Sequence, residues 1–582
     1  MVYYFTGIST SNKLDAWMKI KNVISASTLI FSLLMFSKVS LASDQPLQAP
    51  KFNNLSSFHH EISTKVPDAQ RFFDQGLVLF YGFEWGESIR SFKEATRLDP
   101  NCGMCYWGLA LALGNIINAP LTGHEYSDAQ SAIKKALSLK SYETAEEQEY
   151  IKALVLRFQH APRISSNVGP FSCHTSSSKQ DESTPKEILA YSDAMKKITE
   201  KYPNDHDVKA LYAYALFNRI NWKFWDANGK INSLTPVIIK TLKAIIADEQ
   251  LHIGGNHYYV HVMEQSPQPE DAIDSADRLK ILVPGSEHLV HMPTHIYFLT
   301  GRYHQGTESN LQAIEAYKKY NNACYAQGFK PEINYLYMHN YDFLRTTAMM
   351  EGRKELALTS AKQMHDKPFS AWLASEPTLQ WFIPIPYFVE ARFGMWKELL
   401  NEPMPKSSYQ YALGMWHYVQ GMALVHTGHI NDSERELSSL KNIIAKGNAE
   451  NNLGEQGHNL LKIASEVLTA TIANFQGNEK STITHLKLAA KIQHDMGYHE
   501  PPDWYFPVKE ILGDAYLKWN HPAEAIAMYN QDLKQYPKNG WALYGISRAL
   551  KKQGKNKEAE QVEREFKNAW RYADISVPVN LF

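Results

Sequence analysis

The chain has 582 residues, more than one compact core usually holds, so its length predicts several domains or a repeat architecture. The 60 lysine and arginine residues are balanced by 61 acidic residues, and this leaves no basic surface that would make nucleic acid an expected partner. Hydrophobic residues make up 44% of the chain, as in globular proteins, and four cysteines are too few for a disulfide-stapled fold.

The first 42 residues have the features of an export signal. Lysines precede an apolar stretch over residues 23–36, which is too short for a comfortable bilayer span, and small residues end at Ala42. We expect residues 1–42 to be a signal peptide, with Met18 as an alternative start and Ser43 as the first mature residue. A retained membrane anchor is the alternative. Cleavage predicts a bacterial periplasmic or secreted protein without a permanent anchor.

Residues 43–161 are expected to form helical hairpins. One unit places small residues at offsets 8 and 20, where paired helices touch, an aromatic residue at offset 24 and a proline at offset 32. The residues that mark this unit are Phe72, Gly76, Ser88, Phe92, Ala95 and Pro100. Residues 105–114 and 129–136 are predicted to be the two helices of the next unit.

Cys102 and Cys105 form a C-x-x-C motif at the start of a predicted helix. A helix N-terminus lowers the pKa of a thiol, which suits redox exchange, but the βαβ context of a thioredoxin-like site is absent. A disulfide between the two residues and a pair of buried thiols remain open as alternatives.

Residues 162–185 are rich in Ser, Thr and Lys and lack periodicity, so they are predicted to be a flexible loop. Residues 186–499 are predicted to be degenerate helical repeats around a histidine-rich segment. Glycines typical of the turn between paired helices are Gly301, Gly352, Gly428 and Gly477. No alternating strand pattern of any length occurs, which predicts an all-α fold.

Residues 500–582 contain a C-terminal pair of repeats, the first of them with the same spacing as the N-terminal unit. The residues that mark it are Leu512, Gly513, Tyr516, Ala525, Tyr529 and Pro537. The proline-rich segment ahead of it, residues 500–507, is predicted to be an extended arm that staples the last hairpins to the preceding ones or closes over a ligand.

These units resemble tetratricopeptide repeats (TPRs), which are pairs of antiparallel helices in 34 residues. The chain also resembles a group of large exported bacterial TPR proteins, through residues 257–261 (HYYVH), 288–295 (HLVHMPTH) and 500–504 (EPPDW). The resemblance implies an α-solenoid, a superhelix of stacked hairpins, which binds a peptide or protein partner in the concave groove lined by the first helix of each pair.

Five histidines within 39 residues are the strongest candidates for chemistry. His257 and His261 are four residues apart, so on a helix both rings project from one face and could bind one metal ion. His288, His291 and His295 follow at spacings of three and four, and would share a face of a continuous helix. These five side chains are predicted metal ligands, on two neighbouring helices.

Other residues extend or complicate this prediction. Glu264 would lie on the face of the first pair, as a further ligand or a general base, and His252 and His339 are expected nearby. Pro293 is best tolerated in the first turn of a helix, so a helix that starts near Met292 would leave His288 and His291 on the approach loop. The alternative to a metal site is a polar groove in which histidines bond to backbone carbonyls and stack on tyrosines.

Two functions follow from the sequence. The first is the binding of a peptide or protein partner in the groove of an exported, non-enzymatic TPR-type protein. The alternative is a metal-dependent protein or enzyme with a divalent transition metal at residues 257–295. Common phosphate-binding and hydrolase motifs are absent, which lowers the expectation of nucleotide chemistry without excluding a metal site.

Overall fold

The computed structural model describes residues 49–114, 123–159, 184–226, 228–331, 336–365, 369, 373, 377–451 and 454–577. The predicted signal peptide and residues 162–183 of the predicted loop lie outside the described residues. By their contacts, residues Gln48–Phe582 form one unit.

The described part of the chain is all-α, and its only β-pairing is an isolated bridge between Trp225 and Ile231. The N-terminal half contains α1 (Pro67–Tyr81), α2 (Trp85–Leu98), α3 (Gly103–Leu113), α4 (Gly123–Leu139), α5 (Ala145–Arg157), α6 (Lys186–Lys201), α7 (His206–Arg219), α8 (Thr235–Asp248), α9 (Ile253–Glu264), α10 (Ile273–Leu282), α11 (Glu287–His291), α12 (Pro293–Leu299) and α13 (Tyr303–Ala326). Short 3₁₀ helices cover Lys140–Tyr142 and Pro269–Ala272.

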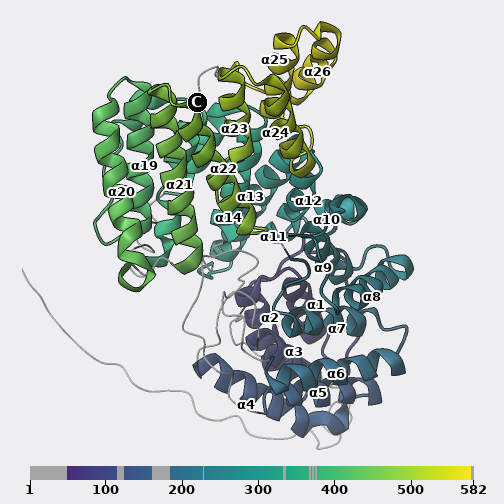
Figure 1. Ribbon diagram of the computed structural model, residues 1–582. Helices are drawn as coiled ribbons and strands as arrows, with labels where there is room; N and C mark the ends of the chain where they lie inside the picture. The colour runs from purple at the N-terminus through teal and green to yellow at the C-terminus, as the bar shows by residue number, and fades with distance from the viewer. Residues whose placement is uncertain are drawn as a thin grey trace, which may run out of the picture. The chain divides into compact units, whose positions relative to one another are not determined.

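The C-terminal half continues in the same manner (Figure 1). It contains α14 (Leu336–Met350), α15 (Lys354–Gln363), α17 (Ile385–Arg392), α18 (Trp396–Leu399), α19 (Gln410–His426), α20 (Ile430–Asn451), α21 (Gly454–Phe475), α22 (Glu479–Asp495), α23 (Val508–Lys518), α24 (Pro522–Gln535), α25 (Gly540–Lys552) and α26 (Asn556–Ala569), with a 3₁₀ helix at Pro377–Phe382. Of the helices in this described portion, none combines the length and the apolar character that a bilayer crossing requires.

Consecutive helices pack as hairpins, and the hairpins stack through their first helices. The pairs α1/α2, α3/α4, α19/α20, α21/α22, α23/α24 and α25/α26 each make extensive contacts, and first helices touch first helices at α1/α3, α7/α9, α9/α12, α11/α14, α19/α21 and α23/α25. This stacking confirms the predicted TPR-type α-solenoid.

The predicted spacing of small and aromatic residues has a direct packing basis. Phe92 is fully buried, and a Cβ atom added to Gly76 of its own hairpin or to Gly108 of the next would come within 2.9 or 2.3 Å of its ring. Tyr529 lies in the same way between Gly513 and Gly545, where an added Cβ would come within 2.6 and 2.3 Å. Each aromatic ring therefore fills the space between two hairpins, and only glycine leaves room for it.

The four predicted turn glycines lie between helices. Gly301 precedes α13, and its φ of 69° belongs to the left-handed region that glycine adopts without strain. Gly352, Gly428 and Gly477 have φ values of 70°, 86° and 77°, and they precede α15, α20 and α22. The predicted turns are thus confirmed.

Candidate metal centre

Six buried histidines gather on the first helices of three successive hairpins. His257 and His261 of α9 lie beside His288 of α11, and we call these three residues the first trio. The second trio is His291 of α11, His295 of α12 and His339 of α14. Within each trio, one ring nitrogen of every residue lies within 4.8 Å of the others, and the six residues are only 0–4% exposed.

The local sequence places the histidines on three separate helices, with His339 on a fourth. His257 and His261 are one turn apart on α9 and face the same side. The expectations for residues 288–295 need correction, because His288 and His291 lie on the short helix α11, which ends at His291, and not on a loop, whereas His295 lies on a separate helix, α12, which begins at Pro293. Proline lacks an amide hydrogen and is best placed at the start of a helix, which separates α12 from α11. His288 joins the first trio, and His291, three residues later on the same helix, joins the second.

The outer nitrogen of several rings is held by an acceptor. His257 Nδ1 donates to the Tyr81 carbonyl oxygen at 2.5 Å, and His291 Nδ1 donates to Asn310 Oδ1 at 2.6 Å. The Asn310 amide donates to the Gly306 carbonyl oxygen at 2.8 Å, which fixes its Oδ1 toward His291. A neutral ring that donates from Nδ1 presents a lone pair at Nε2, so these contacts select the tautomer that binds a metal through Nε2.

Glu264 joins the two trios through their outer nitrogens. Its Oε1 lies 2.8 Å from His261 Nδ1 in the first trio, and its Oε2 lies 2.6 Å from His295 Nδ1 in the second. Glu500, from the arm between α22 and α23, lies 2.5 Å from the same nitrogen of His295. These carboxylates orient the rings from outside, as acceptors commonly do around metal-binding histidines.

The inner nitrogens face one another. His257 Nε2 lies 3.1 Å from His288 Nε2, and His291 Nε2 lies 2.8 Å from His295 Nε2. Two imidazole nitrogens bound to one tetrahedral ion at about 2.05 Å would be roughly 3.3 Å apart, so both separations approach what one shared cation requires. Without a metal, a proton between the two rings would satisfy the same geometry.

Burial keeps three of the rings neutral. It lowers the pKa of His257 to about 3, and together with neighbouring histidines it lowers the pKa of His288 and His291 well below the usual range. Neutral rings offer the lone pairs that a metal needs. His295 differs: burial opposes its charge, but the carboxylates of Glu500 and Glu264 outweigh burial and raise its pKa to about 9.

An aromatic ring covers each trio. The Phe83 centroid, in the turn between α1 and α2, lies 4.5 Å from that of His257 and 5.5 Å from those of His261 and His288. Phe343 of α14 lies 4.7–5.1 Å from the three rings of the second trio. Because α1 packs against α9 and the arm contributes Glu500, the histidines lie beneath other side chains and not on an open groove surface.

Sequence reasoning named the five histidines of residues 257–295 and expected His339 nearby, and the structure brings all six together. It places His252 elsewhere. The residues that hold or cover the rings, Tyr81, Phe83, Asn310 and Glu500, were missed in those roles. Only Glu500 carried a signal, as the first residue of the predicted arm.

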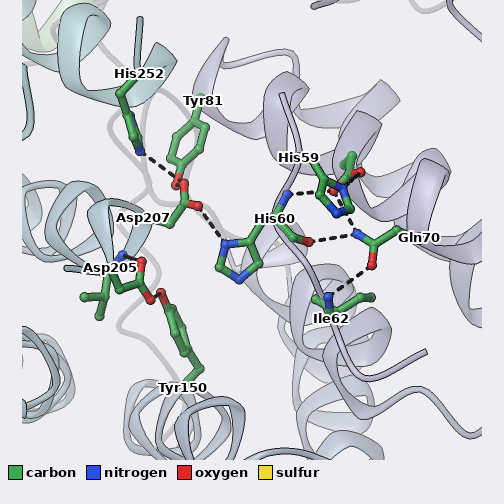
Figure 2. Close-up of polar contacts among 11 residues, drawn as sticks. His59, His60, Ile62, Gln70, Tyr81, Tyr150, Asp205, Asp207 and His252 are labelled. Carbon is green, nitrogen blue, oxygen red and sulfur yellow. Dashed lines mark hydrogen bonds and ion pairs between the residues drawn. The ribbon is translucent and has the colours of Figure 1, made fainter. Parts of the chain in front are cut away.

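His252 belongs to a separate network around Asp207 (Figure 2). One carboxylate oxygen of Asp207 lies 2.7 Å from His60 Nδ1, and the other lies 3.2 Å from His252 Nε2 and 2.5 Å from the Tyr81 hydroxyl. Burial lowers the pKa of His60, but Asp207 outweighs it and raises the value to about 9. Hydrogen bonds from His252 and His60 hold the pKa of Asp207 well below its usual range in spite of burial.

The spacing of His60, Asp205 and Asp207 would also suit a metal ion. Both oxygens of Asp207 are already occupied by His60, His252 and Tyr81, however, and Asp205 accepts hydrogen bonds from the Tyr150 hydroxyl and the Val208 amide. The network therefore has a structural role: Asp207 holds the Tyr81 hydroxyl, and the Tyr81 carbonyl oxygen accepts a hydrogen bond from His257.

The remaining candidates lie outside the trios. Cys102 and Cys105 are joined in a disulfide, and both residues are buried. In the arm, the Tyr505 ring stacks on Phe388 of α17 at 4.7 Å, and its hydroxyl bonds to that of Tyr418 of α19 at 2.9 Å. The arm thus staples preceding hairpins to the C-terminal pair of repeats.

No protein-family model matches the chain, and no curated protein matches it. Among solved structures, the human IFIT1 dimer with m7Gppp-AAAA is 12% identical, with a TM-score of 0.30, over 88% of this chain and 91% of that one. Yeast Tom70 is 12% identical, with a TM-score of 0.25, over 84% and 96%. The TPR domain of P58(IPK) is 11% identical, with a TM-score of 0.21, over 84% and 99%.

Proposed function

We propose that this chain is a metal-binding helical-repeat protein in which each histidine trio binds one transition-metal ion. The observation that carries the proposal is that the two nitrogens of a ring have different partners. Outer nitrogens of His257, His261, His291 and His295 meet oxygen acceptors at 2.5–2.8 Å, while nitrogens from all six rings converge within the trios. Buried histidines that only filled space would not need this common orientation.

The ligand type indicates the class of metal. Three imidazoles suit zinc, copper, iron or nickel, whereas calcium and magnesium prefer oxygen ligands. Three protein ligands also leave a fourth tetrahedral position for a small molecule, as in catalytic zinc sites. The Glu264 carboxylate is directed to the outer nitrogens of His261 and His295, so we propose that it orients the ligands and does not act as a general base.

Titration of the chelator-treated chain with Zn²⁺ or Cu²⁺ tests this function. We expect about two ions per chain, and about one ion in the double variant His257→Ala/His261→Ala or in His291→Ala/His295→Ala. His417→Ala is the matched control, because His417 pairs with Glu436 on α19 and α20, away from the trios. A native chain that binds no metal, or double variants that bind as many ions per chain as the control, would contradict the proposal.

A second candidate function is peptide binding in the C-terminal repeats. A pocket there opens to solvent and is lined largely by first helices. Residues that line it include Trp396, Tyr505, Asp514, Trp541, Tyr544 and Arg548. Aromatic and charged side chains of this kind anchor peptides.

A peptide library displayed on phage tests this second function. Enrichment of one sequence class by the native chain, lost in Tyr544→Ala, would support it. Enrichment that survives both Tyr544→Ala and Arg548→Ala would place any peptide site elsewhere.

We also propose that the protein is exported from a bacterium to the periplasm or beyond, with cleavage before Ser43. The Cys102–Cys105 disulfide supports this location, because disulfides persist in oxidising compartments. The resemblance of residues 257–261 and 288–295 to segments of exported bacterial proteins also supports it. N-terminal sequencing of protein recovered from the cell envelope should begin near Ser43, and an intact start at Met1 or Met18 would contradict export by cleavage.

A further inference from the structure

The two trios lie against each other and act as one structural unit. The ring centroids of His261 and His295 are 6.0 Å apart, and those of His288 and His291 are 6.1 Å apart, so each contact joins one trio to the other. The two oxygens of Glu264 bind one ring from each trio. Two ions held in such adjacent sites could share one small bridging ligand.

The composition of the trios favours copper. Glu264 and Glu500 form a further candidate set with His261, but their oxygens already meet Nδ1 of His261 and His295, so each trio offers imidazole nitrogens alone. Imidazole nitrogens without oxygen ligands suit copper in both its cuprous and cupric states. Copper also binds most tightly among the divalent ions for a given nitrogen site. The carboxylates of Glu264 and Glu500 lie behind His261 and His295, where their negative charge would stabilise the extra positive charge of oxidised ions.

The enclosure of the trios limits the size of the substrate. The six histidines are at most 4% exposed, and Phe83 and Phe343 cover the two trios at centroid distances of 4.5–5.5 Å. A ligand of drug or metabolite size needs a cavity of several hundred Å³, whereas a diatomic molecule needs only a gap between side chains. Apolar aromatic walls also suit an uncharged molecule better than an ion.

We propose that the paired trios form a dinuclear copper centre that binds dioxygen, an inference that rests on the proposed metal-binding function. Two cuprous ions each give one electron to dioxygen, which becomes peroxide held between two cupric ions. The O–O π bond is lost, the O–O σ bond remains, two Cu–O contacts form, and no proton is transferred. Copper is among the metals that carry dioxygen chemistry in proteins.

The test uses the full chain, treated with chelator, loaded with Cu(I) without oxygen and then exposed to dioxygen. We expect about two copper ions per chain, uptake of about one dioxygen per two copper ions, and a new near-ultraviolet absorption band. The oxidised centre should give little electron paramagnetic resonance signal, because two bridged cupric spins couple. His417→Ala is the control and should behave as the native chain.

Two variants keep the outcome interpretable if one of them fails to fold. His257→Ala/His261→Ala and His291→Ala/His295→Ala should each retain about one copper ion, show helical circular dichroism, lack the oxygen-dependent band and give an ordinary Cu(II) signal on oxidation. If the native chain binds two copper ions that oxidise to two separate Cu(II) signals, or that never react with dioxygen, the proposal fails and the metal-binding function stands. If neither copper nor zinc binds, the proposed function itself fails.

Discussion

Replacement of Asn310 by leucine separates metal binding from ordinary packing. Asn310 is fully buried, and it accepts a hydrogen bond from His291 Nδ1 at 2.6 Å while it donates to the Gly306 carbonyl oxygen at 2.8 Å. Leucine has a similar size but no polar atoms, so the ring loses the contact that selects its tautomer. Loss of such an outer partner typically weakens metal affinity about 10–100-fold, or roughly 1.4–2.7 kcal/mol.

The same substitution also destabilises the fold, and a matched control measures that part. The buried His291 Nδ1 loses its partner, at about 1–3 kcal/mol, and the Gly306 carbonyl and the Thr294 hydroxyl each lose one hydrogen bond. Thr307→Val, one turn earlier on α13, breaks buried hydrogen bonds to Thr347 and Glu351 without touching a histidine, and should lower the free energy of unfolding comparably.

Competition with a chromophoric chelator gives the affinity of both variants. We expect one of the two metal ions to bind about 10–100-fold more weakly in Asn310→Leu, with the other unchanged, and native affinities in Thr307→Val. Equal losses in both variants would mean that metal affinity reports only general destabilisation. Native affinities in both would mean that Asn310 does not orient a ligand.

Three further predictions concern stability and the arm. Phe92→Ala empties the space between two hairpins and should lower the free energy of unfolding by about 3–5 kcal/mol in urea titrations, and a loss below about 1 kcal/mol would contradict the packing described. Because the pKa of His60 is raised to about 9, its pair with Asp207 stabilises the fold fully below pH 6.5 and loses that effect as pH rises through 9. The difference in unfolding free energy between the native protein and His60→Gln should therefore shrink over that range. A constant difference would refute the raised pKa of His60. Truncation after Met496 removes Glu500 and the C-terminal repeats, and should reduce thermal stability and metal affinity together, whereas a fragment that melts and binds metal like the full chain would show that neither depends on them.

The repeat pattern and the histidine pairs could be predicted because both depend on local spacing. Offsets 8 and 20 mark where helices touch within a hairpin, and the aromatic residue at offset 24 fills the space between hairpins, as Phe92 does between Gly76 and Gly108. His257 and His261 share a face on any helix. The proline at 293 also signalled a helix start, which the structure places there.

The enclosure of the site could not be predicted from spacing. Glu500 meets His295 across 205 residues, and Tyr81 meets His257 across 176, because stacked hairpins and the arm bring distant segments together. Asn310 lies on α13, the second helix of its hairpin, and nothing in the sequence distinguishes its side chain from that of any other buried asparagine. The sequence predicted histidines on the surface of an open groove, but in the structure they are buried. The packing of α1 against α9, which contributes to this burial, carries no signal in the spacing of residues.

Anomalous X-ray scattering from crystals of the metal-loaded chain locates the ions and so shows whether each trio holds one. We expect two peaks, one about 2.0–2.1 Å from ring nitrogens of His257, His261 and His288, and one at the same distance from those of His291, His295 and His339. Peaks only at other residues, or no peak in crystals of a chain saturated with metal, would contradict that expectation.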